Sequence, residues 1–472
     1  MKILLTGVTG YIGQRLLPVL LNQGHEVFCC VRDKLRFSDR KYSIDPPHIL
    51  EVNFLKPETL VNIPIDIDTA YYLIHSMSST EGDFKSLESE SASNFKYAIE
   101  RTNVKQVIFL SGIINEEKLS KHLASRKKVE EILNSHSYSL TTLRAGIIIG
   151  SGSASFEIMR DLVEKLPVMV TPKWLNTLSQ PIAIRNVIEY LVGVLGNPIT
   201  YNHSFDIGGP DILSYKDMLL IFAKVRKLKR RIFVVPVMTP RLSSYWLYFV
   251  TSISYPLAVN LVNSMKVEVV CKENNLRELL AINLINYETS IELAFEKIEH
   301  HQVVSSWTDS QSTNVLEKGV SYYIDVPVNG CFIDKRRRNI TDIDKTLDNV
   351  FSIGGENGWY YANWLWAIRG FLDKLFGGVG LRRGRKDSKE IYAGETLDFW
   401  KVLFASREDK RLLLYAEMKL PGEAWLEFKI DDNVLTQTAT FRPLGLWGRA
   451  YWYSVLPFHG FIFRGMLRNI AR

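Results

Sequence analysis

Cysteine is scarce in this chain, with four residues in 472. Cys29 and Cys30 are adjacent in an apolar run, whereas Cys271 and Cys331 stand far apart, and no cysteine or histidine pair has the spacing of metal ligands. This pattern excludes a fold held together by disulfides and predicts no zinc site or other metal site.

Long uncharged stretches and targeting segments are also scarce. Residues 242–265 carry no charge and are long enough to cross a bilayer, but their hydroxyl side chains and Pro256 favour a buried helical hairpin instead. A strand is expected from residue 2 onward, which leaves no room for a signal or transit peptide. The sequence therefore favours a cytoplasmic protein in a reducing environment.

Acidic residues are absent from 433–472, although the net charge of the whole chain is only +7. That segment carries five arginines among many aromatic residues, and the aromatic segment 359–376 leads into a basic run at 382–386. Such a composition is typical of a peripheral membrane surface. It is also typical of a core or ligand cavity lined by large rings, which the sequence favours. No recognition helix or RNA-binding signature is present, so nucleic acid is not an expected partner.

Glycines mark the first turn of the chain. Residues 3–5 are typical of a buried strand and 11–22 of a helix, so Gly7, Gly10 and Gly13 fall at a strand-to-helix junction. Free N–H groups and the helix dipole favour an anion there. Gly7 permits the tight turn, Gly10 lets phosphates approach the backbone, and Gly13 lets the helix pack closely. The loop predicted to bind a dinucleotide comprises Gly7, Thr9, Gly10, Tyr11, Ile12 and Gly13.

The second expected strand, 26–31, ends at a basic residue. Arg32 stands where an NAD-specific site would have an acid, and a cation there suits the 2′-phosphate of NADP(H). Lys34 and Arg36 add to the local positive charge. NADP(H) is therefore the preferred cofactor, while Asp33 keeps NAD(H) as an alternative and a solvated basic loop stays open as a third interpretation.

Strand and helix patterns alternate through residue 207, which predicts a Rossmann-type parallel sheet. Further strands are expected at 49–52, 69–74, 106–110, 140–143 and 204–207, with helices at 83–101, 117–134, 156–166 and 184–195. A capped helix at 214–225 and a strand at 231–235 then indicate a small substrate lid. This α/β domain is expected to cover 1–292, lid included, and a polar linker to cover 293–320.

The composition changes again from residue 321. Short alternating strands are expected at 321–326, 396–405, 411–419, 424–430 and 434–442, around helices at 364–376 and 446–467. These elements predict an α+β domain over 321–472, with an antiparallel sheet and a long terminal helix.

Several segments in this order resemble one family. The glycine loop, Arg32, and the segments 71–76, 109–112 and 205–210 resemble the atypical short-chain dehydrogenase/reductases, near the epimerase-like and NmrA-like branches. The segments 358–363 and 435–443 resemble a poorly characterised domain often fused behind such reductases, which is thought to be similar to START-like helix-grip folds. The resemblance covers nearly the whole chain and names no chemistry for the second half.

The resemblance implies roles for residues after the third, fourth and fifth strands. Asn53 matches the position, usually Asp, that contacts the adenine. Leu73, His75 and Ser76 correspond to the strand end beside the ribose, and Ser111 to the serine that orients a substrate carbonyl.

The catalytic frame departs from the family. The familiar pair is a Tyr and a Lys four residues apart, and here that frame holds His122 and Arg126. His122 can donate a proton near neutral pH, although an adjacent guanidinium would favour its neutral form. Arg126 can bind ribose or phosphate but cannot relay protons. His122 as an ordinary surface histidine and Ser111 as an ordinary strand-end residue stay open.

Three functions follow from these observations. The first is an NADP(H)-dependent oxidoreductase that acts on a carbonyl or hydroxyl of an apolar small molecule, with Ser111, His122 and Arg126 as catalytic candidates. The second is a nonenzymatic NADP(H)-binding sensor or ligand carrier. The third is a peripheral membrane protein that binds lipid through residues 320–472.

Overall fold

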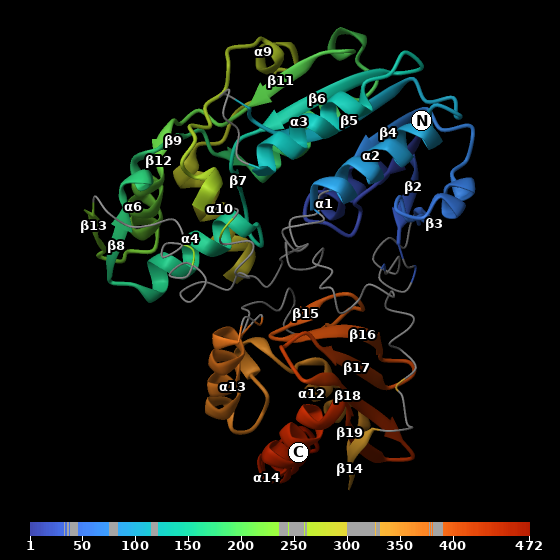
Figure 1. Ribbon diagram of the computed structural model, residues 1–472, viewed down its shortest axis with the longest axis vertical. Coiled ribbons are helices and arrows are strands. Elements are labelled where there is room, and N and C mark those ends of the chain that lie inside the picture. Colours follow the sequence, from blue (N-terminus) through green and yellow to red (C-terminus); the bar gives the residue numbers. More distant parts are fainter. Residues whose placement is uncertain are drawn as a thin grey trace. The chain divides into compact units, whose positions relative to one another are not determined.

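The chain forms two compact units in the computed structural model, one made of Met1–Lys34 with Asp39–Gln311 and the other containing Ser312–Arg472. Figure 1 labels their elements. The residues that the structure describes are 1–32, 34, 37, 46–74, 84–114, 121–235, 244, 259, 262–299, 326, 331–376, 378, 380 and 390–472.

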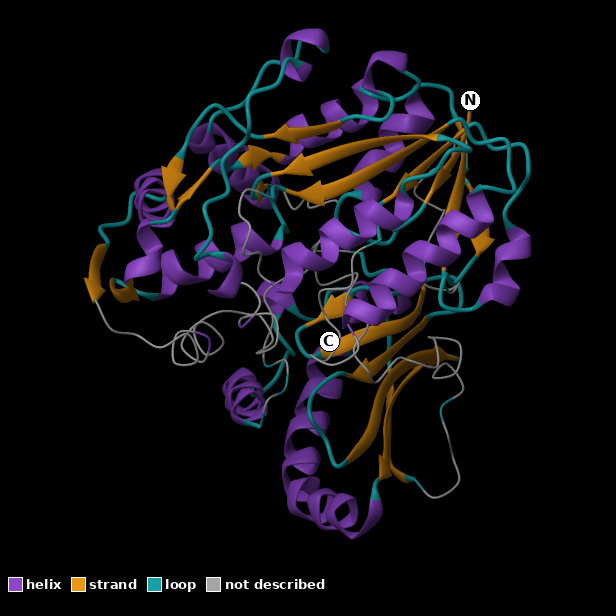
Figure 2. Cartoon of the chain, turned by 45° about the horizontal axis from the view of Figure 1, so that its top comes forward, coloured by secondary structure: helices purple, strands orange, loops and turns teal. Residues whose placement is uncertain are grey.

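A seven-stranded sheet organises the first unit, in the order β11-β6-β5-β4-β1-β2-β3. All neighbouring strands are parallel, so they run side by side in one direction (Figure 2). The strands are β1 (Lys2–Leu5), β2 (Glu26–Val31), β3 (His48–Glu51), β4 (Thr69–Tyr72), β5 (Gln106–Gly112), β6 (Ser139–Ala145) and β11 (Ser204–Ile207). The central strands are buried on both faces, as expected of uninterrupted apolar runs in a parallel sheet. The predicted Rossmann-type sheet is confirmed.

Helices cover both faces of this sheet. Consecutive residues of β4 show the division, because Tyr71 Oη donates to the Leu191 carbonyl oxygen in α5 and Tyr72 Oη lies 3.3 Å from Ser91 Oγ in α2. Helices α1 (Gly13–Asn22) and α5 (Ile184–Gly193) pack on one face, and α2 (Phe84–Ile99) and α3 (Lys121–Leu133) on the other. The crossovers thus bury the sheet from both sides.

A smaller subdomain of the first unit has its own core. Phe156, Phe222 and Phe295 meet at ring-centroid distances of 5.2–5.4 Å, one from each of α4 (Ala154–Lys165), α6 (Tyr215–Val225) and α10 (Tyr287–Glu299). Helix α6 begins at a capping box between Ser214 and Asp217. The remaining elements here are the parallel pair β8 (Val168–Pro172) and β13 (Arg231–Val235) and the short strands β7 (Ile148–Ile149), β10 (Ile182–Ala183), β9 (Leu178–Ser179) and β12 (Leu213–Ser214). Helix α9 (Leu276–Leu279) lies instead near β11 (Figure 1), and just before it Asn274 Nδ2 donates to the Asp206 carbonyl oxygen of that strand.

The second unit is an antiparallel sheet packed against helices, as predicted. Its strand order is β14-β19-β18-β17-β16-β15. The strands are β14 (Phe332–Asn339), β15 (Thr396–Leu397), β16 (Trp400–Ser406), β17 (Arg411–Ala416), β18 (Gly422–Asp431) and β19 (Val434–Pro443), and the helices are α12 (Ile343–Phe351), α13 (Asn363–Leu375) and α14 (Gly445–Ile470). Inward residues of the sheet, α12 and α14 form one large apolar cluster.

Four sequence expectations need correction or fall outside the described residues. Helix α10 continues to Glu299, so the linker expected from 293 begins inside a helix. The strand expected at 396–405 is split at Asp398, whose φ of 51° reverses the chain between β15 and β16. The strand expected at 321–326 and the hairpin at 242–265 lie mostly outside the described residues. Within the described residues, no helix is long and apolar enough to span a membrane.

One strand and one α-helix of the second unit were not expected from the sequence. Strand β14 carries five charged residues among its eight, and helix α12 follows directly. Charged edge strands of this kind protect a sheet from pairing with other chains, but their sequences lack the apolar alternation that predicts a strand.

Candidate functional site

The candidate cofactor residues lie along one edge of the parallel sheet. Because the strands are parallel, their carboxyl ends share that edge, and the order β3-β2-β1-β4-β5 arranges the residues that follow them. Asn53 follows β3, Arg32 follows β2, Leu73 follows β4, and Ser111 lies near the end of β5. The chain leaves β1 toward β2 on one side, whereas β4 lies on the other, and such a switch point is where open α/β sheets bind ligands.

The glycine loop lies at this switch point. Gly7 has a φ of +65°, and a Cβ built on it would come 2.6 Å from the Leu73 carbonyl oxygen. A Cβ on Gly13 would come 2.4 Å from the Gly7 carbonyl oxygen, so both glycines are required by close packing of backbone. Gly10 is less confined, since its Cβ would meet only the Gly7 oxygen, at 3.1 Å.

The loop leaves backbone donors available. Gly10 N–H donates to the Gly7 carbonyl oxygen at 2.9 Å and closes the turn. The N–H groups of Val8, Thr9, Ile12 and Gly13 donate to no other residue in the described part of the chain. Unpaired N–H groups at the start of a helix carry partial positive charge and favour an anion.

Thr6 fixes the loop to the neighbouring strand, a role that the sequence analysis missed. Its buried hydroxyl donates to the Tyr71 carbonyl oxygen at 2.9 Å and accepts from Leu73 N–H at 3.1 Å. Thr6 N–H also donates to the Tyr71 oxygen, at 3.1 Å. These bonds hold the ends of β1 and β4 together, and only the pairing of two distant strands makes them visible.

Tyr11 anchors the loop to a second distant segment. The Arg15 guanidinium lies 4.6 Å from the Tyr11 ring centroid and donates to the Ser151 carbonyl oxygen at 2.6 Å. A Cβ on Gly150 would come 2.7 Å from the Tyr11 hydroxyl, which therefore faces that segment. Burial raises the pKa of Tyr11 to about 12 and keeps it neutral. Arg15 and Ser151 were not among the predicted residues.

Arg32 and Asn53 extend the edge beyond β1. Arg32 directly follows β2 and is exposed. Asn53 is half-buried in a turn, where its Oδ1 accepts from Leu55 N–H at 3.1 Å. Its Nδ2 donates no hydrogen bond to the residues that the structure describes, so it is the side-chain group that remains available.

Ser111 is a buried hydroxyl without a partner. It is 6% exposed, and its Oγ makes no hydrogen bond with any described residue. A buried hydroxyl in this state costs about 1–3 kcal/mol relative to a satisfied one. Such a group is an available donor at the sheet edge.

The structure describes the side chain of only one of the two catalytic candidates on α3. His122 belongs to the first turn of α3, but its side chain lies outside the described part of the structure, as do His75 and Ser76. Arg126 is described in full and is 6% exposed. Its guanidinium donates to the carbonyl oxygens of Ile74 and Leu110.

Further contacts fix Arg126 in place. Its guanidinium lies 4.8 Å from the Phe109 ring centroid. Burial lowers the pKa of Arg126, and the nearby carboxylate of buried Glu88 acts in the opposite direction. Ser125 Oγ donates to Glu88 Oε2 at 2.5 Å. Arg126 thus ties the ends of β4 and β5 to α2 and α3.

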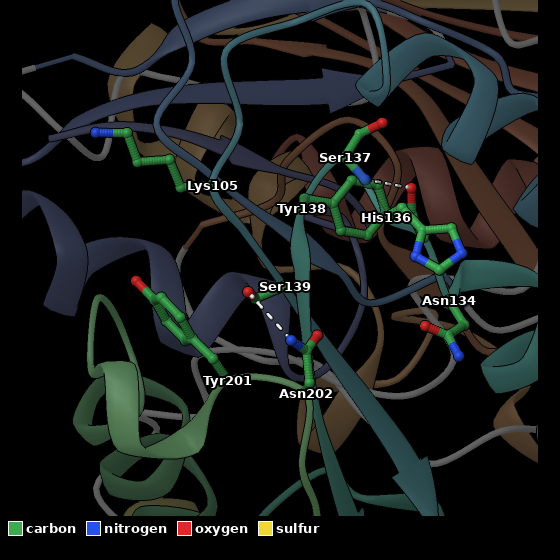
Figure 3. Close-up of a pocket in the computed structure, with 9 residues that line it drawn as sticks. Lys105, Asn134, His136, Ser137, Tyr138, Ser139, Tyr201 and Asn202 are labelled. Carbon is green, nitrogen blue, oxygen red and sulfur yellow. Dashed lines mark hydrogen bonds between the residues drawn. The ribbon is translucent and has the colours of Figure 1, made fainter.

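A polar hollow of about 530 Å³ lies at the opposite edge of the sheet (Figure 3). Lys105 and Ser139, at the amino ends of β5 and β6, line it together with Asn202. None of the candidate residues lines this hollow, so it is separate from the glycine loop. Among the described residues there is also no cluster of three or more potential metal ligands.

Two segments match known families. Residues 7–153 match a family described as NAD(P)H-binding, and residues 330–466 match a protein family of unknown function, DUF2867. No curated protein matches the chain.

Solved structures resemble the first unit. A nucleoside-diphosphate-sugar epimerase from Staphylococcus aureus is 14% identical and covers 62% of this chain and 100% of its own, with a TM-score of 0.51. A UDP-glucose 4-epimerase from Thermotoga maritima is 13% identical over 64% of this chain and 99% of its own, with a TM-score of 0.49. At these identities the likeness concerns the fold alone. Residues 7–153 are therefore an NAD(P)-binding domain of Rossmann type, and residues 330–466 belong to a family without an assigned function.

Proposed function

We propose that this protein is an NADP(H)-dependent oxidoreductase of the short-chain dehydrogenase/reductase type, which acts on a carbonyl or hydroxyl group of an apolar small molecule. The observation that carries the proposal is the set of free N–H groups at Val8, Thr9, Ile12 and Gly13, which open α1 at the switch point of the sheet. These groups suit the pyrophosphate of a dinucleotide. The proposed place of work is the cytoplasm, where the four cysteines would stay reduced.

Arg32 supports the preference for NADP(H). It follows β2 next to the glycine loop, where the ribose 2′-group of a dinucleotide lies in this fold. A guanidinium pairs well with a phosphate dianion and gains nothing from a neutral 2′-hydroxyl. The half-buried Asn53, two strands from the loop, would hold the adenine through Nδ2.

Ser111 supports the step from binding to chemistry. When bound, the nicotinamide exchanges a hydride with the substrate carbon. The unpartnered Ser111 Oγ at the end of β5 would donate to the substrate oxygen, and His122 in α3 would polarise the same oxygen and hold its proton.

Arg126 favours a second function. Its guanidinium donates to the carbonyl oxygens of Ile74 and Leu110 and so connects the ends of β4 and β5. The family has a lysine that relays protons at this position. A protein with this replacement can bind NADP(H) without turning it over. The alternative is a nonenzymatic NADP(H) sensor or ligand carrier.

Cofactor titration tests the shared part of both functions. Calorimetric titration of the full chain should give tighter binding of NADPH than of NADH. Gly10→Val should abolish binding of both, because a Cβ on Gly10 meets only the Gly7 oxygen of the protein and would stand where the phosphates must approach the backbone. Arg32→Ala should weaken NADPH binding by about tenfold or more and leave NADH unchanged. Lys127→Ala, an exposed cation on α3, is the matched control. Equal affinities for both cofactors, or binding that survives Gly10→Val, would contradict the proposal.

Turnover separates the enzyme from the sensor. NADPH oxidation should be followed by the loss of the absorbance of the reduced nicotinamide, with a panel of apolar ketones and aldehydes. Oxidation that Ser111→Ala slows without changing NADPH affinity supports the enzyme. Tight NADPH binding without turnover of any compound supports the sensor.

A further inference from the structure

Helix α13 of the second unit presents an apolar face to solvent. Trp364 is 63% exposed, Phe371 59% and Phe376, just after the helix, 77%. The outward residues recur every three to four positions and therefore form one stripe. They are Asn363, Trp364, Ala367, Ile368, Phe371, Leu372, Leu375 and Phe376, and none is charged.

The opposite face of α13 holds the helix in the domain. Trp366 is 8% exposed and packs 5.1 Å from Trp359 and 5.8 Å from Phe399, measured between ring centroids. Asp373 is buried and accepts from Lys419 N–H at 2.7 Å and from Gly380 N–H at 2.9 Å. Packing and hydrogen bonds thus fix α13, whereas the apolar side chains of its outward stripe take no part in the large apolar cluster of the unit.

Helix α14 also carries exposed aromatic side chains, one of which contacts the segment just before α13. Phe461 is 54% exposed, and its ring centroid lies 5.1 Å from that of Tyr361, which precedes α13. Trp447 is 83% exposed and Phe458 54%. In Figure 1 both helices belong to the second unit, with α13 beside its sheet. We call the outward stripe of α13 together with these three residues of α14 the aromatic surface.

The exposed charged residues of α13 and α14 themselves are all positive. Arg449, Arg464 and Arg468 are exposed on α14, and Arg369 on α13 lies 6.0 Å from the Tyr451 ring centroid. No acidic residue occurs from 433 to 472, and Asp373, the single acid of α13, is buried. A second copy of this chain would bring like charges together, whereas an anionic partner would neutralise them.

We propose that the aromatic surface binds the interface of an anionic lipid bilayer. Trp and Phe side chains on one face of a helix enter the boundary between headgroups and acyl chains, and arginines beside them pair with anionic headgroups. Surfaces that expose several large apolar residues together mark interaction sites in general, and here the surrounding charge selects a membrane.

Flotation of the full chain with lipid vesicles tests the proposal. The protein should bind vesicles of phosphatidylcholine with phosphatidylserine more tightly than vesicles of phosphatidylcholine alone, and high salt should remove the difference. The double variant Trp364→Ser/Phe371→Ser should lose binding by about tenfold or more. Arg464→Ala/Arg468→Ala should reduce only the preference for the anionic vesicles.

Controls separate this effect from misfolding. Phe233→Ser removes a phenylalanine of similar exposure, 55%, from the first unit and should leave vesicle binding unchanged. The melting temperature of Trp364→Ser/Phe371→Ser should equal that of the wild type, because both side chains face solvent. Wild-type protein that binds neither vesicle, or a double variant that binds both as tightly, would overturn the proposal. Self-association that the double variant abolishes, without vesicle binding, would assign the surface to a second copy instead.

Discussion

A Cβ placed on Gly7 would come 2.6 Å from the carbonyl oxygen of Leu73, on the neighbouring strand of the sheet. Gly7 also has a φ of +65°, so any other residue there meets both backbone strain and a backbone collision. Gly7→Ala should lower the free energy of unfolding of the first unit by about 2–4 kcal/mol, measured by urea denaturation. Gly24→Ala is the matched control, because Gly24 has a φ of +76° with nothing within 4 Å of its Cβ. Equal losses in the two variants would show that strain alone acts at Gly7.

Two buried hydroxyls at the same edge should respond in opposite directions. Thr6 Oγ1 makes two hydrogen bonds, so Thr6→Val should destabilise the first unit by about 1–3 kcal/mol. Ser111 Oγ has no partner among the described residues, so Ser111→Ala should leave stability unchanged or raise it by about 1 kcal/mol. Thermal or urea unfolding of both variants measures this. A large loss of stability in Ser111→Ala would mean that the hydroxyl has a structural partner and would weaken its proposed role.

Arg126 and Glu88 should be coupled in stability. Arg126→Met removes the donors to Ile74 and Leu110 and leaves the buried Glu88 carboxylate without its cation, so unfolding should become easier by about 3–5 kcal/mol. Adding Glu88→Gln should recover part of that loss, because the uncompensated charge is then gone. Urea denaturation of the two single variants and the double variant gives the coupling energy. Strictly additive losses would show that the two charges act independently.

Asp398 should make the second unit less stable at neutral pH. Burial raises the pKa of its carboxyl to about 6, although Trp359 Nε1 donates to Oδ2 at 2.7 Å. The folded state holds the proton of Asp398 more tightly than the unfolded chain does, so protonated Asp398 contributes to the stability of the fold. This contribution is complete below about pH 4 and is lost as the pH rises through 6. Asp398→Asn keeps an acceptor for Trp359 and tolerates the φ of 51°, so it should stabilise the unit by about 1–2 kcal/mol at pH 7 and not at pH 4.

The comparison for Asp398→Asn is Asp398→Ala, measured by unfolding at both pH values. Alanine leaves the Trp359 donor unpaired and strains the backbone, so this variant should be less stable than the wild type at pH 4 and at pH 7. A stabilisation by Asp398→Asn that is the same at both pH values would contradict the raised pKa.

Local patterns were sufficient to predict much of the fold. The strand, glycine turn and helix of residues 2–22 follow from apolar spacing and glycine alone, and the strands at 204–207 and 231–235 have the predicted bounds. Strand β14 was missed because its five charges hide a strand that is exposed on one side. The split at Asp398 was missed because a positive φ at an aspartate has no local sequence signal.

The aromatic residues of the second unit show the limit of composition. The sequence favoured a ring-lined core for all of them, yet Trp359 and Trp366 are buried whereas Trp364, Phe371 and Trp447 are exposed. Neighbouring positions on one helix thus have opposite surroundings, and the pattern of apolar residues does not say which face is covered.

By itself, the sequence determined the glycine loop between β1 and α1, the alternation of strands and helices that gives a parallel sheet, and the positive charge that follows β2, because each depends on residues close together in the chain. Only the tertiary structure decided that Thr6 bonds to Tyr71 and Leu73, that Arg126 is committed to two strand ends, and that the Ser111 hydroxyl is left without a partner among the described residues. Hydrogen bonds and burial of this kind depend on segments up to tens of residues apart, and those segments meet only when the sheet assembles.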